Sequence, residues 1–171
     1  MTHPTFVNLI EGLCRDYGLD QPERIVRGGP LAIGDVVFSL SCDERLAPGL
    51  VFIHCDYGPV SRTRQAEVYR SLLEANMALY SGSAAAYTVS PDSGHVVAVD
   101  HRRLDECTPA ALRALLGQMQ AQAKAWRTDY SLFEAAATRG VPAAPKPAAH
   151  ASRHSTARRF SSLRDSAPRS A

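Results

Sequence analysis

The chain has 171 residues, of which 45% are hydrophobic and 21% charged, enough for one folded domain with a real core. Its formal net charge of +2 is unevenly distributed. Residues 1–140 hold 13 Lys and Arg against 16 Asp and Glu, whereas residues 141–171 hold 6 against 1. An acidic body lacks the clustered cations that nucleic-acid binding requires. No apolar run reaches the roughly 20 residues of a membrane span.

The N-terminus and the cysteines predict a cytoplasmic protein rather than a secreted one. The N-terminal residues MTHPTFVNLIEGL contain neither a basic region nor a cleavage site, so they do not resemble a signal peptide. The cysteines are widely spaced and form no CxxC pair, which favours free thiols in a reducing compartment. These cysteines are Cys14, Cys42, Cys55 and Cys107.

An amphipathic helix is predicted at the start of the chain and strands after it. Apolar residues recur at helical spacing from Phe6 to Tyr17, and Gly18 is suited to end the helix. Strand patterns follow over 31–33 and 36–42, with Gly34 at the bend between them, and then over 50–55. The short connections favour antiparallel pairing.

The central helix, expected to start near Ser61, is apolar over more of its circumference than one small domain can cover. A second copy of the chain would cover the remainder, which predicts a homodimer, and a binding groove is the alternative. The residues predicted for the dimer interface are Val68, Leu72, Ala75 and Leu79.

Two more strands and a last helix complete the predicted domain. The strands cover 85–89 and 96–100, and the helix starts at Thr108 and Pro109 and carries Trp126 on its apolar face. The sequence therefore predicts an α+β fold in the order α-β-β-β-α-β-β-α, with helices packed on a small antiparallel sheet. The predicted domain spans 1–138, and residues 139–171, rich in Ala, Pro, Ser and Arg, predict a disordered basic tail.

One motif suggests chemistry. His54 and Cys55 begin a run that comes within one residue of the signature of cysteine-dependent phosphatases, in which a loop cradles phosphate before a helix. Here Ser61 stands where the signature has its arginine, and Arg62 comes one position late. Pro59 also removes a backbone N–H that the cradle would use. A phosphatase-like enzyme with Cys55 as its nucleophile is therefore the less favoured alternative.

No other pattern predicts a catalytic, cofactor or metal site. His95, His101 and Cys107 lack the spacing of metal ligands, and the chain has no GxGxxG, GxxxxGK[ST] or HExxH motif. The sequence predicts a protein without enzymatic activity and without a cofactor.

The element order and several of its residues resemble the class I type III secretion chaperones, the Tir chaperone family. The likeness covers about residues 4–135. It is carried by the first helix, by Gly58 and Pro59 before the LLEAN run of residues 72–76, and by a final helix ending at Trp126.

The resemblance implies a cytoplasmic homodimer that binds the N-terminal region of a secreted effector or translocator in a partly extended state. It would keep this client from folding or aggregating and assist its delivery to the secretion apparatus, whose ATPase is a further possible partner.

A regulatory adaptor acting through the basic tail is another alternative to the chaperone. The residues predicted for the effector-binding patches are Phe6, Leu9, Leu13, Ile33, Phe38 and Leu40.

Overall fold

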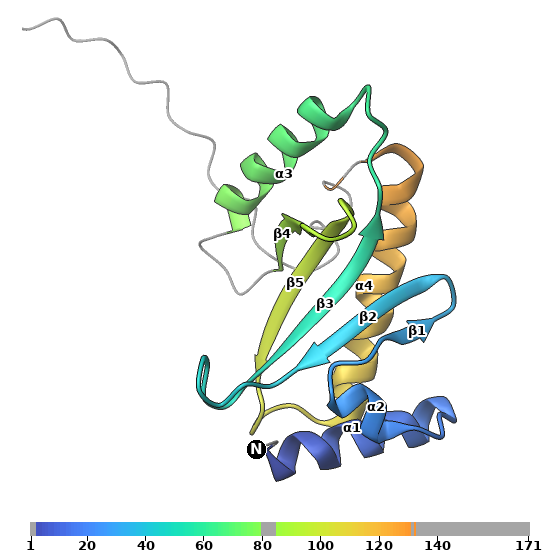
Figure 1. Cartoon of the computed structure of the whole chain (residues 1–171), viewed down its shortest axis with the longest axis vertical. Coiled ribbons are helices and arrows are strands. Elements are labelled where there is room, and N and C mark those ends of the chain that lie inside the picture. The colour runs from blue at the N-terminus through green and yellow to red at the C-terminus, as the bar shows by residue number, and fades with distance from the viewer. Residues whose placement is uncertain (1–2, 80–84, 131, 133–171) are drawn as a thin grey trace, which may run out of the picture. The chain divides into compact units, whose positions relative to one another are not determined.

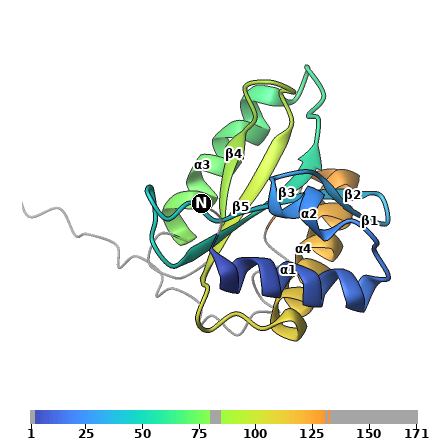
Figure 2. The ribbon, with the colours of Figure 1, turned by 60° about the horizontal axis from the view of Figure 1, so that its bottom comes forward.

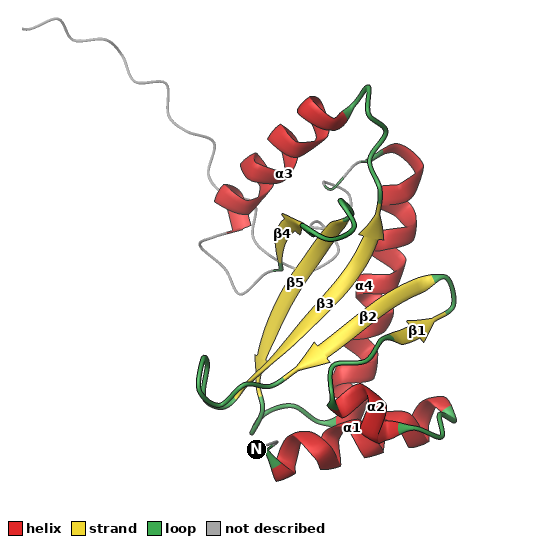
Figure 3. Ribbon diagram, in the orientation of Figure 1, coloured by secondary structure: helices red, strands yellow, loops and turns green. Residues whose placement is uncertain are grey.

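A computed structural model describes residues 3–79, 85–130 and 132 of the chain. Over these residues it contains helices and strands in the order that the sequence predicts, with one short helix in addition (Figure 3). The elements are α1 (Pro4–Tyr17), α2 (Pro22–Val26), β1 (Leu31–Ile33), β2 (Val36–Ser41), β3 (Leu50–Gly58), α3 (Gln65–Leu79), β4 (Ala86–Val89), β5 (Val96–Arg103) and α4 (Pro109–Asp129).

The strands form one five-stranded sheet in the order β1-β2-β3-β5-β4, and every pair is antiparallel (Figure 1). β3 and β5 are the longest strands and pair from Leu50 opposite Arg103 to Gly58 opposite Val96. This arrangement confirms the predicted α+β fold with an antiparallel sheet. Gly34, at φ 61°, lies in the tight turn that joins β1 to β2, in the left-handed region that glycine adopts without strain.

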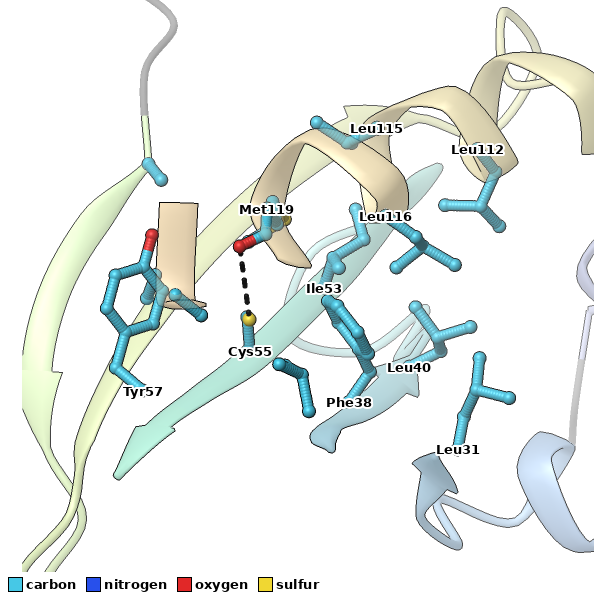
Figure 4. Close-up of a cluster of buried hydrophobic side chains, with 14 of the residues drawn as sticks. Leu31, Phe38, Leu40, Ile53, Cys55, Tyr57, Leu112, Leu115, Leu116 and Met119 are labelled. Atoms are coloured by element: carbon cyan, nitrogen blue, oxygen red, sulfur yellow. Dashed lines mark hydrogen bonds between the residues drawn. The ribbon is translucent and has the colours of Figure 1, made fainter. Parts of the chain in front are cut away.

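Helix α4 covers one face of the sheet and forms the core with it (Figure 4). Alternate residues of β3 point to this face, as the two-residue period of a strand requires. On α4, Thr108 accepts a hydrogen bond from the Ala111 backbone N–H and caps the helix, as the sequence indicates. The core-facing residues of these two elements are Val51, Ile53, Cys55, Tyr57, Leu112, Leu115, Leu116, Met119, Ala123 and Trp126.

Helix α1 lies across the N-terminal end of α4 (Figure 2). The two helices approach so closely that a Cβ atom at Gly12 would lie 2.6 Å from the Pro109 side chain. Because this distance is too short for two carbon atoms, the position requires glycine. α1 ends at Gly18, at φ 65°, whose N–H bonds back to the Arg15 carbonyl. The apolar stripe of α1 is buried against α2 and α4.

Helix α3 lies along the outer edge of the sheet, beside β4 (Figure 1). The side-chain amide of Asn76 pairs with the backbone of Tyr87 in both directions. Its nitrogen donates to the Tyr87 carbonyl over 2.8 Å, and its oxygen accepts from the Tyr87 N–H over 2.7 Å. An amide group thus takes the place that a neighbouring strand would occupy on β4.

Some boundaries differ from those predicted. The sequence gives no sign of α2, β3 runs three residues further to Gly58, and α3 starts at Gln65 rather than near Ser61. The Arg64 N–H bonds to the Ser61 carbonyl, so these residues form a turn before the helix begins. The predicted basic tail, 139–171, lies outside the described residues.

Candidate protein-binding surface

Cys55, the candidate nucleophile, is fully buried under α4. Its thiol lies 3.9 Å from the Met119 carbonyl oxygen, to which it can donate (Figure 4). Burial raises the pKa of Cys55 from 9.0 to about 12; the guanidinium of Arg127 lowers it in part, and the carboxylate of Asp56 raises it slightly. The reactive thiolate is therefore not formed near neutral pH.

The backbone around Cys55 does not form a phosphate cradle. β3 continues in extended form from Cys55 to Gly58, and α3 begins only at Gln65. A cradle requires a loop between the cysteine and the first turn of a helix, so that successive N–H groups converge on one point. The position of Cys55 inside a strand gives the phosphatase alternative no support.

Within residues 3–79, 85–130 and 132, no three His, Cys, Asp or Glu side chains are grouped so that they could hold a metal ion. No helix in this part of the chain has the length and apolar character needed to cross a bilayer.

The residues predicted to bind an effector are mostly in the core. Phe6, Leu9 and Leu13 of α1 are between 0 and 4% exposed, because α4 and α2 cover them. In β2, Phe38 and Leu40 are equally buried. Their role stays a prediction, but in this conformation these five side chains have no surface for a partner. Ile33, at the end of β1, is half-buried and can still contact one.

Three of the four predicted dimer residues lie on the inner side of α3. Val68, Leu72 and Ala75 are 3 to 6% exposed and pack on the protomer's own core. The side chain of Leu79 lies outside what the structure describes, and the predicted interface stays a prediction. The opposite face of α3 carries Leu73, 70% exposed, and Met77, 84% exposed.

The interface predicted from the sequence does not include Leu73 and Met77, although both are apolar residues of the same predicted helix. They are four residues apart and so lie above one another on a helix. The sequence shows two overlapping apolar stripes on this helix, one through Tyr69 and Leu73 and one through Val68 and Ala75, with Leu72 in both. Only the structure shows that the second stripe faces the core. We call the surface formed by Leu73 and Met77 the α3 outer face.

Further apolar side chains are exposed elsewhere on the described part of the chain. Val37 of β2 and Val89 of β4 are 42% and 38% exposed, and Leu46 in the β2–β3 connection is 84% exposed. The face of the sheet opposite α4 carries Phe52 and Val97, both partly buried. A groove of about 650 Å³ lies between the end of α2 and the start of the β2–β3 connection; it is lined by Val26, Arg27, Gly28, Ser41, Cys42, Asp43, Glu44 and Arg45.

Contiguous exposed apolar patches are typical of surfaces that contact another protein. Residues 45–127 match the Tir chaperone protein (CesT) family. This match confirms the resemblance that the sequence predicts. None of the curated proteins matches the sequence.

Solved structures share this fold. A chain of the HopA1–SchA chaperone–effector complex aligns with a TM-score of 0.56 at 15% identity, over 72% of this chain and 94% of that one. A chain of the ExsC–ExsE complex aligns with a TM-score of 0.58 at 14% identity, over 72% of this chain and 91% of that one. The structure of the Yersinia pestis type III secretion chaperone SycH with a fragment of YscM2 aligns with a TM-score of 0.52 at 15% identity, over 70% of this chain and 98% of that one.

Proposed function

We propose that this protein is a type III secretion chaperone of the bacterial cytoplasm that has no enzymatic activity. It binds the N-terminal region of a secreted effector or translocator in a partly extended state and assists its delivery to the secretion apparatus. The observation that carries the proposal is the family match over residues 45–127, which coincides with a domain that exposes apolar side chains and buries its one candidate nucleophile.

The chaperone is proposed to act as a homodimer that pairs through the α3 outer face. Leu73 and Met77 are the two largest exposed apolar side chains of any described helix, and exposure of such a pair on one face is unfavourable unless a partner covers it. A two-fold contact would place this face of one protomer against the same face of its partner. The inner residues Val68, Leu72 and Ala75 then support the helix from beneath.

The client is proposed to add to the sheet at the β1 edge. An extended peptide gains affinity from main-chain hydrogen bonds to an unpaired strand. The β4 edge offers no such place, because Asn76 already pairs with the Tyr87 backbone and α3 lies over the strand. β1 is the other edge strand, and half-buried Ile33 lies on it.

The dimer is tested by placing a charge on the α3 outer face. The double variant Leu73→Asp/Met77→Asp is expected to run at half the wild-type mass in light scattering, because two carboxylates from each protomer would be buried against each other. The control is Leu46→Asp, which introduces one such carboxylate at a similarly exposed leucine outside α3. A wild-type protein that is monomeric at micromolar concentration would contradict the proposed dimer.

The client is tested by co-purification of the tagged full-length chain from its native cell, with identification of the bound protein by mass spectrometry. A secreted substrate of the type III apparatus supports the proposal. Removal of residues 141–171 is expected to weaken this binding only mildly, whereas its complete loss would favour the adaptor alternative. Turnover of an aryl phosphate that disappears in Cys55→Ser would show that the protein is an enzyme after all.

A further inference from the structure

The C-terminal end of α4 is joined to the turn before α3 by contacts that centre on Tyr130. Its hydroxyl accepts a hydrogen bond of 3.2 Å from the Ser61 backbone N–H. The guanidinium of Arg64 lies over the Tyr130 ring, 5.0 Å from its centroid, in a cation–π contact. The same guanidinium donates to the Asp129 carbonyl over 3.3 Å and pairs with Glu67 of α3 at 3.2 Å.

The backbone at Tyr130 is unusual as well. Among the described residues it is the one position other than glycine with a positive φ, 63°. A side chain with a Cβ is disfavoured there, which is why α1 ends on Gly18 in the same conformation. A tyrosine at this helix end needs compensating interactions, and its contacts with Ser61 and Arg64 provide them.

Tyr130 also begins a chain of aromatic contacts that returns to α3 from the other side. The centroid of its ring lies 4.9 Å from that of Trp126. The Trp126 centroid lies 5.5 Å from that of Tyr57, and the Tyr57 centroid lies 5.7 Å from that of Tyr87. Tyr87 is the residue whose backbone pairs with Asn76 of α3. Helix α3 is therefore held near its start by Tyr130 and towards its end by Asn76, and the two attachments are joined through the core.

We propose that Tyr130 is a positioning residue for the α3 outer face: it holds the start of α3 against α4 and so fixes the direction in which Leu73 and Met77 point. The proposal rests on the proposed function only where it names this face as the surface that pairs with a second copy. Without the Tyr130 contacts, α3 can turn about its Asn76 attachment, while the packing of α4 through Leu116 is unaffected.

Hydrogen exchange of the full-length protein tests this positioning. In Tyr130→Ala and in Arg64→Ala, backbone amides of α3 are expected to exchange about tenfold faster, the effect of losing one hydrogen bond and one cation–π contact. Amides of α1 are expected to exchange as in the wild type. Tyr130→Phe keeps the ring and loses only the hydroxyl, so it is expected to give a smaller increase.

The matched control is Arg70→Ala. Arg70 also lies on α3 and also pairs with a glutamate, Glu74 at 2.9 Å, but it does not reach Tyr130. Its removal is expected to leave exchange in α3 within about twofold of the wild type, as for an exposed ion pair. A tenfold increase in Arg70→Ala would overturn the proposal, because it would show that loss of any arginine here loosens the helix.

Two other results would also overturn it. Exchange in α3 that stays unchanged in both Tyr130→Ala and Arg64→Ala would show that the contacts do not hold the helix. Faster exchange confined to the last turn of α4 would show that Tyr130 is only a helix cap. If Tyr130→Ala does not fold, Tyr130→Phe and Arg64→Ala decide the question. The exchange pattern is read equally well in a monomer, so failure of the proposed dimer and failure of this positioning role are distinguishable.

Discussion

Helices α3 and α4 are both rich in apolar residues, yet they are held very differently. α4 buries a continuous face on the sheet, including Leu116 and Trp126, and its polar side also contacts the strands. Arg127 donates to the carbonyls of Tyr57 and Asp56 over 2.8 and 2.9 Å and contacts the Asp35 carboxylate at 3.0 Å. α3 buries only its inner stripe and leaves its outer face exposed. We infer that α4 organises the fold, whereas α3 presents a surface.

The comparison predicts different costs for the same truncation on the two helices. Leu116→Ala on α4 is expected to lower the free energy of unfolding by about 3–5 kcal/mol, since the fully buried site cannot collapse around the cavity. Leu72→Ala on α3 is expected to cost about 2–3 kcal/mol, at the low end of the same range, because α3 can shift towards the gap. Urea unfolding monitored by circular dichroism measures both. An equal or larger loss for Leu72→Ala would contradict the comparison.

The polar attachment of α4 makes a second prediction. Arg127→Met keeps most of the aliphatic stem but removes the donors to Tyr57, Asp56 and Asp35. The free energy of unfolding is expected to fall by about 1–3 kcal/mol, because backbone carbonyls at the end of β3 lose a charged donor. The control is Arg113→Met, an arginine of the same helix whose guanidinium stacks on Tyr17 without an ion pair among the described residues. Similar losses in both variants would show that Arg127 is not an anchor.

The same attachment should depend on pH through Asp35. A hydrogen bond from Lys124, together with the charges of Lys124 and Arg127, holds the pKa of this carboxyl below its usual range. Because the folded-state pKa is lowered, the stabilisation is present above the unfolded pKa of about 3.9 and is lost as the pH falls through the folded value. The difference in unfolding free energy between wild type and Asp35→Asn is expected to shrink between pH 6 and pH 2. A difference that stays constant would contradict this assignment.

The smallest expected effect is a difference in how often the two helices move away from the core. Cys55 lies beneath α4, and burial raises its pKa to about 12, so labelling by a thiol reagent at pH 8 requires α4 to move. In a Val68→Cys variant the new thiol lies beneath α3. Peptide mass spectrometry is expected to show faster labelling at position 68 than at Cys55. Faster labelling of Cys55 would reverse the comparison.

Much of this organisation could be predicted from the sequence, because strand alternation, the capping pattern at Thr108 and Pro109, and Gly18 are local signals. α2 was not predictable since its five residues are too few to show a helical period. The end of β3 was misjudged because Gly58 and Pro59 signal a turn, whereas Gly58, at φ 98°, closes the strand beside a bulge in the pairing with β5.

The candidate site was less predictable than the fold. An apolar stripe shows that a helix face avoids water, but not whether the cover comes from the same chain or another. Phe6 and Leu9 were expected to have a surface for a client, yet α2 and α4 bury them. On α3, both stripes have helical spacing, so which one faces the core depends on where Asn76 meets β4. Such a contact between distant segments leaves no periodic trace in the sequence.

The amide of Asn76 also limits how this protein can assemble. A sheet with two unpaired edges can take a strand on each side, and such a protomer is able to polymerise into a fibre. With the β4 edge occupied by a side chain, edge-to-edge pairing of protomers can use β1 alone, and it closes after two copies. A protein whose proposed clients are extended and prone to aggregate would thus avoid templating that aggregation through its own sheet.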